Sequence, residues 1–208
     1  MIIFIYIYKV VKKILRLLKK SGWIIVFLKL KLNNVKFYSD FKSHGIPIVQ
    51  VSLKAKKFFI GHNFEMNNGL YNNMIGRQQP CFFIVEKHGE LIIGNNVGIS
   101  ATAIVCTQQI IIEDNVRIGG GTVIYDTDFH SLNNQERVAK PEIRKNIKTA
   151  PILIKENAFI GANCTILKGV TIGQNSIIGA SSVVTKNIPD NQIWAGNPAR
   201  YIKDILCK

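Results

Sequence analysis

Aliphatic residues recur at every sixth position for long stretches from Ile93 onward, and small or β-branched residues follow four positions after them. The aliphatic positions are Ile93, Ile99, Ile112, Ile118, Ile124, Ile154, Ile160, Ile166, Ile172, Ile178 and Val184. The second set contains Val97, Ala103, Val116, Thr122, Ala158, Cys164, Val170, Ser176 and Ser182. This period fits neither a helix nor a simple alternating strand.

A six-residue period fits a short strand followed by a tight turn, and three such units close a triangular coil of about 18 residues. Coils stacked at the strand spacing of about 4.8 Å would place Ile154 directly over Ile172. The pattern therefore predicts an all-β protein, a parallel β-helix whose narrow interior is filled by columns of branched side chains.

The repeat is interrupted twice. The step from Val105 to Ile112 contains one residue too many, which predicts one irregular corner. A longer interruption separates Ile124 from Ile154, and much of it is polar, charged and aperiodic. A loop of this length inside a compact repeat is usually functional. We therefore expect a β-helix domain over residues 58–198 with an inserted loop near 131–150.

The N-terminal segment, residues 1–57, carries most of the net charge of +14, since it holds thirteen lysines and arginines and one acid. Residues 9–20 place apolar side chains on one helical face (Val10, Ile14, Leu17 and Leu18) and basic ones on the other. Such a basic amphipathic helix, followed by Trp23, predicts either contact with an anionic membrane or packing against this or a neighbouring subunit. No nucleic-acid motif accompanies the charge, so we expect no nucleic-acid partner.

No stretch is apolar for the roughly 18 residues that span a bilayer, and the run Met1–Tyr8 lacks the features of a signal peptide. The cysteines show neither a CxxC pair nor metal-ligand spacing, which indicates a reduced protein without a bound metal. These cysteines are Cys81, Cys106, Cys164 and Cys207. We expect a cytoplasmic protein, peripheral on the inner face of the cytoplasmic membrane if the helix binds lipid.

His130 is the candidate catalytic residue because it stands where the repeat gives way to the long loop. The other histidines, His44, His62 and His88, are expected to be structural or exposed. A neutral imidazole can remove the proton of a hydroxyl that attacks an activated acyl group. Asp128 or Asp126 could orient the ring and favour its protonated form, although both could equally be polar turn residues. We take His130 as general base and Asp128 as its catalytic partner.

Residues from about 58 to 205 resemble the hexapeptide-repeat acyltransferases, which include galactoside, maltose and many polysaccharide O-acetyltransferases. Besides the hexads, the resemblance rests on Asp128-Phe129-His130, on Phe159-Ile160-Gly161-Ala162, on residues 178–186 and on residues 195–200. It implies a left-handed coil, against the usual right-handed crossover. It also implies a homotrimer with each site between two prisms, acetyl-CoA as donor, and a short C-terminal helix over 199–208.

The resemblance further implies roles for single residues. Ala162 and Ala180 match turn positions whose backbone meets the pantetheine arm of CoA, and Thr185 and Lys186 match positions near its adenosine. Arg200 and Lys203 match basic positions near its phosphates, where cations answer the phosphate charge. Ser100 falls roughly where sugar acetyltransferases of this family place an acceptor-binding asparagine, so Ser100 is the candidate substrate-binding residue.

These observations predict an acetyl-CoA-dependent O-acetyltransferase acting on a sugar hydroxyl. The segment Asn72–Arg77 and Cys81 also resemble members linked to surface-polysaccharide synthesis, where the acceptor would be a glycan or a lipid-linked sugar. The alternative acceptor is another small molecule, an antibiotic or serine. A zinc hydratase of similar fold would need three clustered histidines, which the spacing of His62, His88 and His130 does not provide. A non-catalytic scaffold would lack the loop and its histidine.

Overall fold

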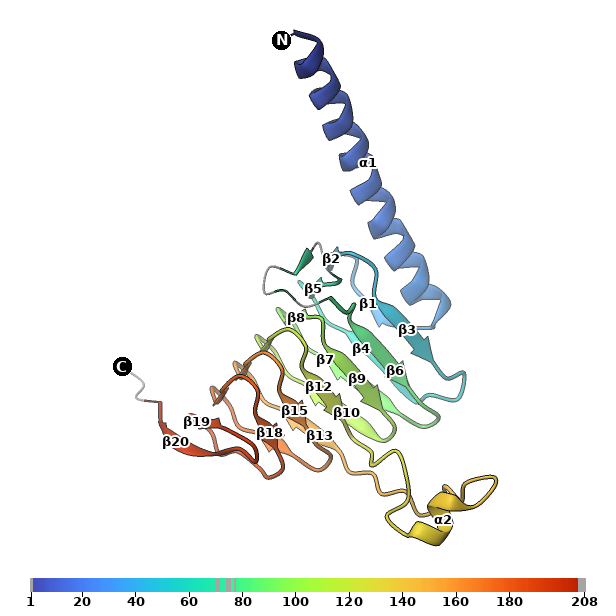
Figure 1. Cartoon of the computed structure of the whole chain (residues 1–208), viewed down its shortest axis with the longest axis vertical. Helices are drawn as coiled ribbons and strands as arrows, with labels where there is room; N and C mark the ends of the chain where they lie inside the picture. Colours follow the sequence, from blue (N-terminus) through green and yellow to red (C-terminus); the bar gives the residue numbers. More distant parts are fainter. Residues whose placement is uncertain (1, 70–71, 74–75, 77, 206–208) are drawn as a thin grey trace.

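The long helix and the β-strands form two distinct parts of this computed structural model (Figure 1). The structure describes residues 2–69, 72–73, 76 and 78–205, without the side chains of residues 2–4 and 11–21. Helix α1 (Ile2–Leu32) stands at one end of a prism of stacked coils. The second helix, α2 (Asn134–Val138), lies in a long arm near the middle of the prism.

Three sheets form the sides of the prism, and neighbouring strands within each sheet pair in parallel except at the C-terminal end. Sheet A contains β1 (Lys36–Phe37), β4 (Lys57–Ile60), β7 (Glu90–Ile93), β10 (Gln109–Ile112), β13 (Ile152–Ile154) and β16 (Thr171–Ile172). Sheet B contains β2 (Lys42–His44), β5 (Glu65–Asn67), β8 (Gly98–Ser100), β11 (Arg117–Ile118), β14 (Phe159–Ile160), β17 (Ile177–Ile178), β19 (Gln192–Ala195) and β20 (Arg200–Asp204). Sheet C contains β3 (Ile48–Val51), β6 (Phe82–Val85), β9 (Ala103–Cys106), β12 (Val123–Tyr125), β15 (Thr165–Ile166) and β18 (Val183–Val184).

The strand register confirms the predicted columns. Ile154 pairs with Ile172, Ile160 with Ile178, and Ile166 with Val184. All six of these side chains are fully buried. One residue of each hexad therefore fills the interior, and the outward residues of each strand decide what the three faces of the prism present.

The corner between sheets A and B is built by asparagines in the left-handed backbone region. Asn63, Asn96 and Asn115 have φ between 53° and 61°, a region that asparagine tolerates better than most residues. Their side chains form a ladder, in which Asn63 donates to Asn96 and Asn96 donates to Asn115, both at 3.1 Å. The turn that each coil needs and the bond that ties it to the next coil thus come from one residue type.

Both ends of the β-helix differ from the predicted boundaries. The coils begin at β1, not at residue 58, since Lys36 pairs with Phe59 and Val49 pairs with Phe83. The first coil has irregular turns, so its buried residues Val35 and Phe41 fall outside the six-residue period. The predicted C-terminal helix is wrong for Arg200–Asp204, which forms β20 antiparallel to β19 because the last coil leaves that strand edge unpaired. Residues 206–208, Cys207 among them, lie outside the described residues.

The C-terminal third of α1 caps the open end of the prism. Val26 and Leu30 are fully buried. Trp23 stacks on Phe27 and on Phe41, with ring centroids 5.2 and 5.5 Å apart, and this cluster closes the first coil. The predicted helix is thus confirmed, and its last turns pack on the chain's own core.

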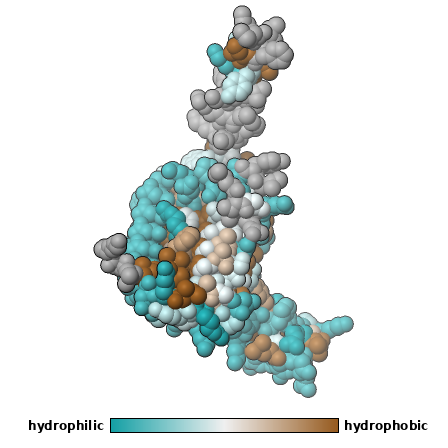
Figure 2. Space-filling view, turned by 60° about the vertical axis from the view of Figure 1, so that its left-hand side comes forward, coloured by the Kyte–Doolittle hydropathy of each residue, from teal (hydrophilic) through white to brown (hydrophobic). Residues whose placement is uncertain are grey.

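The N-terminal part of α1 extends away from the prism (Figure 1). Apolar side chains gather at its far end (Figure 2), where Ile5, Tyr6, Ile7 and Tyr8 are all exposed. The predicted apolar face of Ile14, Leu17 and Leu18 lies among side chains outside the description. Neither α1 nor any other described helix is apolar over enough of its length to cross a bilayer.

Candidate active site

Asp126 holds the irregular corner that the seven-residue step predicted. Its fully buried carboxylate accepts hydrogen bonds from the backbone N–H groups of Thr107, Gln108 and Gln109 at 2.7, 2.7 and 2.9 Å. A buried carboxylate is stable only when such donors replace its lost hydration. Asp126 therefore shapes the backbone, and it does not orient His130.

The arm, residues 127–149, leaves the prism at the corner between sheets C and A and returns to it beside its own start (Figure 1). Thr127 and Thr149 form an antiparallel bridge, and the N–H of Asp128 donates to the carbonyl of Lys148 at 3.1 Å. Helix α2 within the arm is capped by the Asn133 side chain. The base of the arm is thus tied to the coil, which fixes the position of residues just beyond β12.

His130 lies on the arm with its ring held by Glu142. Nδ1 is 3.0 and 3.2 Å from the two carboxylate oxygens of Glu142. The His130 side chain is 63% exposed, and Nε2 forms no hydrogen bond with any described residue. A carboxylate on Nδ1 keeps the proton on that nitrogen, which leaves the lone pair of Nε2 available to accept a proton. The hydrogen bond from His130 in turn holds the pKa of Glu142 below its usual value.

Asp128 does not orient His130, so that prediction is wrong. Its Oδ1 lies 2.5 Å from Lys168 Nζ, and its Oδ2 is buried without a hydrogen-bond partner among the described atoms. Sequence reasoning missed Glu142 because it stands twelve positions after His130 in an aperiodic segment. The signal available was composition, since Glu136 and Glu142 are the acids of residues 131–150. Glu136 accepts a hydrogen bond from the Ser131 hydroxyl, so Glu142 is the acid of this segment that contacts the His130 ring.

The predicted cofactor residues Ala162 and Ala180 share one corner, between sheets B and C, with Ser100 at the end of β8. Backbone bonds stack the turns of this corner, such as Ser181 N–H to Ala162 O at 2.8 Å. A side chain on Gly161 would come within 2.6 Å of the Ala180 nitrogen, so the turns are packed backbone against backbone. The corner therefore presents a continuous strip of peptide groups and small side chains.

The predicted phosphate-binding side chains lie at the C-terminal end of the prism. Lys186 follows β18, and Arg200 and Lys203 are on β20. All three side chains are exposed, as is that of Thr185. None of the three cations forms an ion pair with a described carboxylate, so their charge is available to a ligand.

Within a single chain, His130 lies apart from the predicted substrate-binding and cofactor-binding residues. His130 leaves the corner between sheets C and A, whereas Ser100, Ala162 and Ala180 lie on the corner between sheets B and C. The width of sheet C separates the two corners. The two corners nevertheless lie at the same level along the prism axis. Strand β12, which leads to His130, belongs to the coil that lies between the coil of Ser100 and the coil of Ala162.

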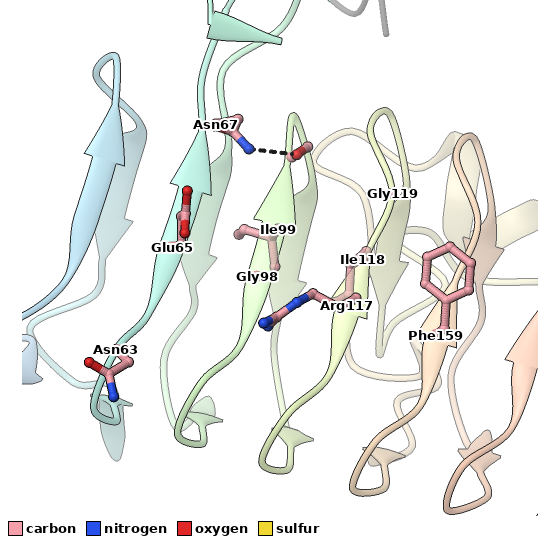
Figure 3. Close-up of a pocket in the computed structure, with 10 residues that line it drawn as sticks. Asn63, Glu65, Asn67, Gly98, Ile99, Arg117, Ile118, Gly119 and Phe159 are labelled. Carbon is pink, nitrogen blue, oxygen red and sulfur yellow. Dashed lines mark hydrogen bonds between the residues drawn. The ribbon is translucent and has the colours of Figure 1, made fainter. Parts of the chain in front are cut away.

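A groove crosses the outer face of sheet B beside Ser100 (Figure 3). Asn67 Nδ2 donates to Ser100 Oγ at 3.1 Å at one end of the groove. The groove continues past Gly98 and Arg117 to Phe159. Ser100 is thus part of a polar hollow on the surface of the prism.

The described residues contain no cluster of three or more His, Cys, Asp or Glu that could hold a metal ion. Cys81, Cys106 and Cys164 are free thiols that face the interior. Burial raises the pKa of Cys81 to about 12, so its thiol stays protonated and unreactive at neutral pH.

The coils are similar to those of known transferases. Residues 151–186 match the model described as bacterial transferase hexapeptide (six repeats). A hexapeptide-repeat acetyltransferase from Vibrio cholerae, solved in complex with acetyl-CoA, superposes with a TM-score of 0.54 at 27% identity, covering 71% of each chain. In residues 151–186 the chain is similar to the bacterial hexapeptide transferases, and in its coils to a hexapeptide-repeat acetyltransferase. Its prism is accordingly a left-handed parallel β-helix.

Two curated relatives of this chain come from Escherichia coli. Galactoside O-acetyltransferase is 52% identical over 66 residues, which are 31% of this chain and 32% of that protein. WbbJ, whose name describes a lipopolysaccharide biosynthesis O-acetyl transferase, is 28% identical over 69% of each chain. The matched region thus spans about a third of the length of the galactoside enzyme and about two thirds of WbbJ.

Proposed function

We propose that this protein transfers an acetyl group from acetyl-CoA to a sugar hydroxyl, with His130 as general base. The proposal depends on one observation above all, the Glu142-bound imidazole whose Nε2 is open at the base of the arm. It is supported by the relatives named for O-acetyl transfer to galactosides and in lipopolysaccharide biosynthesis, and by the family structure that holds acetyl-CoA.

In the proposed reaction the acceptor oxygen attacks the thioester carbonyl while its proton moves to His130 Nε2. The tetrahedral intermediate then breaks its C–S bond, and the CoA sulfur takes the proton back from the imidazolium. One C–O bond forms and one C–S bond breaks, so no acyl-enzyme is needed. Glu142 favours the cationic imidazolium between the two proton transfers, since a carboxylate beside the ring stabilises its charge.

The strip at the corner between sheets B and C suits the donor. Small residues such as Ala162 and Ala180 let an extended pantetheine arm approach the backbone and bond to its peptide groups. Exposed Lys186, Arg200 and Lys203 at the C-terminal end offer cations to the phosphates, with Thr185 beside them. The thioester would then lie near the turn Gly119–Thr122, and the acceptor near Ser100 one coil further.

A complete site requires a second copy, and we propose a homotrimer with sheet C facing the threefold axis. In that arrangement the His130 corner of one copy meets the Ser100 corner of the next. The outward side chains of the central strands of sheet C, β6, β9 and β12, support it because they are apolar and half-buried, among them Ile84, Ala103, Val105, Val123 and Tyr125. A mass of one chain by light scattering at micromolar concentration would contradict this assembly.

We further propose a cytoplasmic location with peripheral attachment to the inner membrane face through α1. The exposed group at Ile5–Tyr8 beside the lysines and arginines of residues 9–20 suits the interface of an anionic bilayer. Flotation with phosphatidylglycerol vesicles tests this. Full-length protein should float and a variant lacking residues 1–22 should not; equal flotation of the two proteins counts against the attachment.

The reaction itself is tested by thiol release from acetyl-CoA with candidate acceptors, corrected for hydrolysis without acceptor. We expect release that depends on a sugar and a product heavier by one acetyl group. If thiol release requires serine or an aminoglycoside and not a sugar, the acceptor is that small molecule and the sugar proposal is wrong.

A further inference from the structure

The groove on sheet B continues beyond the proposed acceptor position. It begins at Asn67 and Ser100, at the corner where the reacting hydroxyl would lie, and it crosses β5, β8, β11 and β14 (Figure 3). At the usual strand spacing these four strands span about 14 Å. One pyranose ring at the corner would occupy only the first part of this length.

Gly98 leaves room in the groove for the side chain of Arg117. In its column of outward residues, Gly98 pairs with Glu65 on one side and with Arg117 on the other. A methyl group at Gly98 would come within 3.1 Å of Arg117 Cδ, so the missing side chain is what lets the arginine lie across β8. The Arg117 side chain therefore covers Gly98 and carries its guanidinium toward the Glu65 side of the groove.

The lining of the groove suits neutral hydroxyl groups. Glu65 accepts hydrogen bonds, Arg117 donates them, and Asn63, Asn67 and Ser100 can do both. Arg117 forms no ion pair among the described residues, although its Nη1 donates to the carbonyl of Asn96. Charges of both signs in one hollow favour a ligand with many hydroxyls over an anion or a cation.

An aromatic ring closes the far end. Phe159 is 48% exposed on β14, beside Arg117, and such a ring can pack against the apolar face of a sugar. The other two faces of the prism differ at this height. Sheet A presents Ile92 and Ile111, and sheet C presents Val105 and Val123, all half-buried and apolar.

We infer that this groove is a second sugar subsite, so that the acceptor is a glycan of at least two linked sugars. The reacting sugar lies at the corner by Ser100, and the next sugar lies against the Arg117 guanidinium that covers Gly98, on the side that faces Glu65. This inference rests on the proposed function and deepens it, since a glycan fills the groove and a free monosaccharide, an antibiotic of one ring or serine does not.

The test compares kcat/KM of the full-length enzyme for galactose with lactose, and for glucose with maltose and maltotriose, with acetyl-CoA as donor. We expect the disaccharide of the active pair to exceed its monosaccharide about 10-fold, the scale of one hydrogen bond to a charged group. Arg117→Ala and Gly98→Ala should each reduce that ratio at least several-fold. Lys57→Ala removes an exposed cation from sheet A and should leave the ratio unchanged.

The outcomes separate this inference from the proposed function. Acetylation of a monosaccharide and its disaccharide with equal kcat/KM, or an unchanged ratio in both groove variants, overturns the second subsite and leaves the acetyltransferase standing. Acetylation of none of the five sugars overturns both. Unfolding temperatures of the variants within a few degrees of the parent protein exclude misfolding as the cause of a lost preference.

Discussion

Two regions of this protein hold a histidine on a carboxylate with nearly the same geometry. On the arm, His130 Nδ1 lies 3.0 Å from Glu142, and between the first two coils His62 Nδ1 lies 3.0 Å from Asp40. Both rings are more than half exposed. In each pair the histidine holds the pKa of its carboxylate below the usual value. By distance and electrostatics alone the two pairs are equivalent.

Their surroundings separate them. His62 is stacked on Tyr38 with ring centroids 3.5 Å apart, in the first turns of the prism. His130 instead stands on the arm, level with the middle of the corner strip that carries Ser100 and Ala162. The comparison teaches that a histidine–carboxylate pair identifies a candidate base only when its free nitrogen faces a place where substrates can lie.

The largest expected effect is that of His130→Ala, which should lower kcat/KM for acetyl transfer by about 10²–10⁴-fold, the usual contribution of a general base. His62→Ala is the matched control and should change kcat/KM less than about two-fold. Thiol release from acetyl-CoA measures both. Equal losses in the two variants would contradict the distinction between the pairs.

Asp126→Ala should have the next largest effect, on stability. Three backbone N–H groups lose the buried carboxylate that accepts their hydrogen bonds, which should lower the free energy of unfolding by about 3 kcal/mol. Urea unfolding measures this value, with Glu86→Ala as an exposed control. A variant as stable as the parent protein would mean that water replaces the carboxylate at this corner.

Glu142→Gln should lower kcat/KM about 10-fold, because the ring loses the charge that stabilises its protonated form. Asp40→Asn, the same change in the first coil, should leave activity unaltered. The lowered pKa of Glu142 predicts the pH range as well. The carboxylate stays ionised above its ordinary pKa of 4.5 and its contribution is lost only as pH falls through the lower folded value.

The Glu142 carboxylate is therefore ionised throughout roughly pH 6 to pH 8, and the parent enzyme should exceed Glu142→Gln across this range. A pH profile of kcat/KM for both proteins checks this. A difference that disappears within this range would show that Glu142 does not act as an ionised partner of His130.

Much of the fold follows from the sequence because the interior of a β-helix repeats. Each coil must place a similar side chain in each column, so residues far apart in the chain, such as Ile112, Ile154 and Ile172, obey one local rule. His130 became the candidate base for the same reason, since it stands at the point where the six-residue repeat ends. The first coil and the C-terminal strand were missed because their positions depend on pairing with particular strands and not on the six-residue repeat. Lys36 pairs with Phe59, and Tyr201 pairs with Trp194.

The stacked coils, the position of the arm and the N-terminal helix can all be read from the order of the residues, which also marks His130 as a candidate. Which acid meets that histidine depends on the folded chain, because Asp126, Asp128 and Glu142 all lie within reach along the chain. In the folded chain Asp126 accepts hydrogen bonds from three backbone amides, Asp128 pairs with Lys168, and Glu142 contacts His130. Periodicity constrains only the residues that face the core, whereas a partner on an aperiodic arm depends on how that arm returns to the prism.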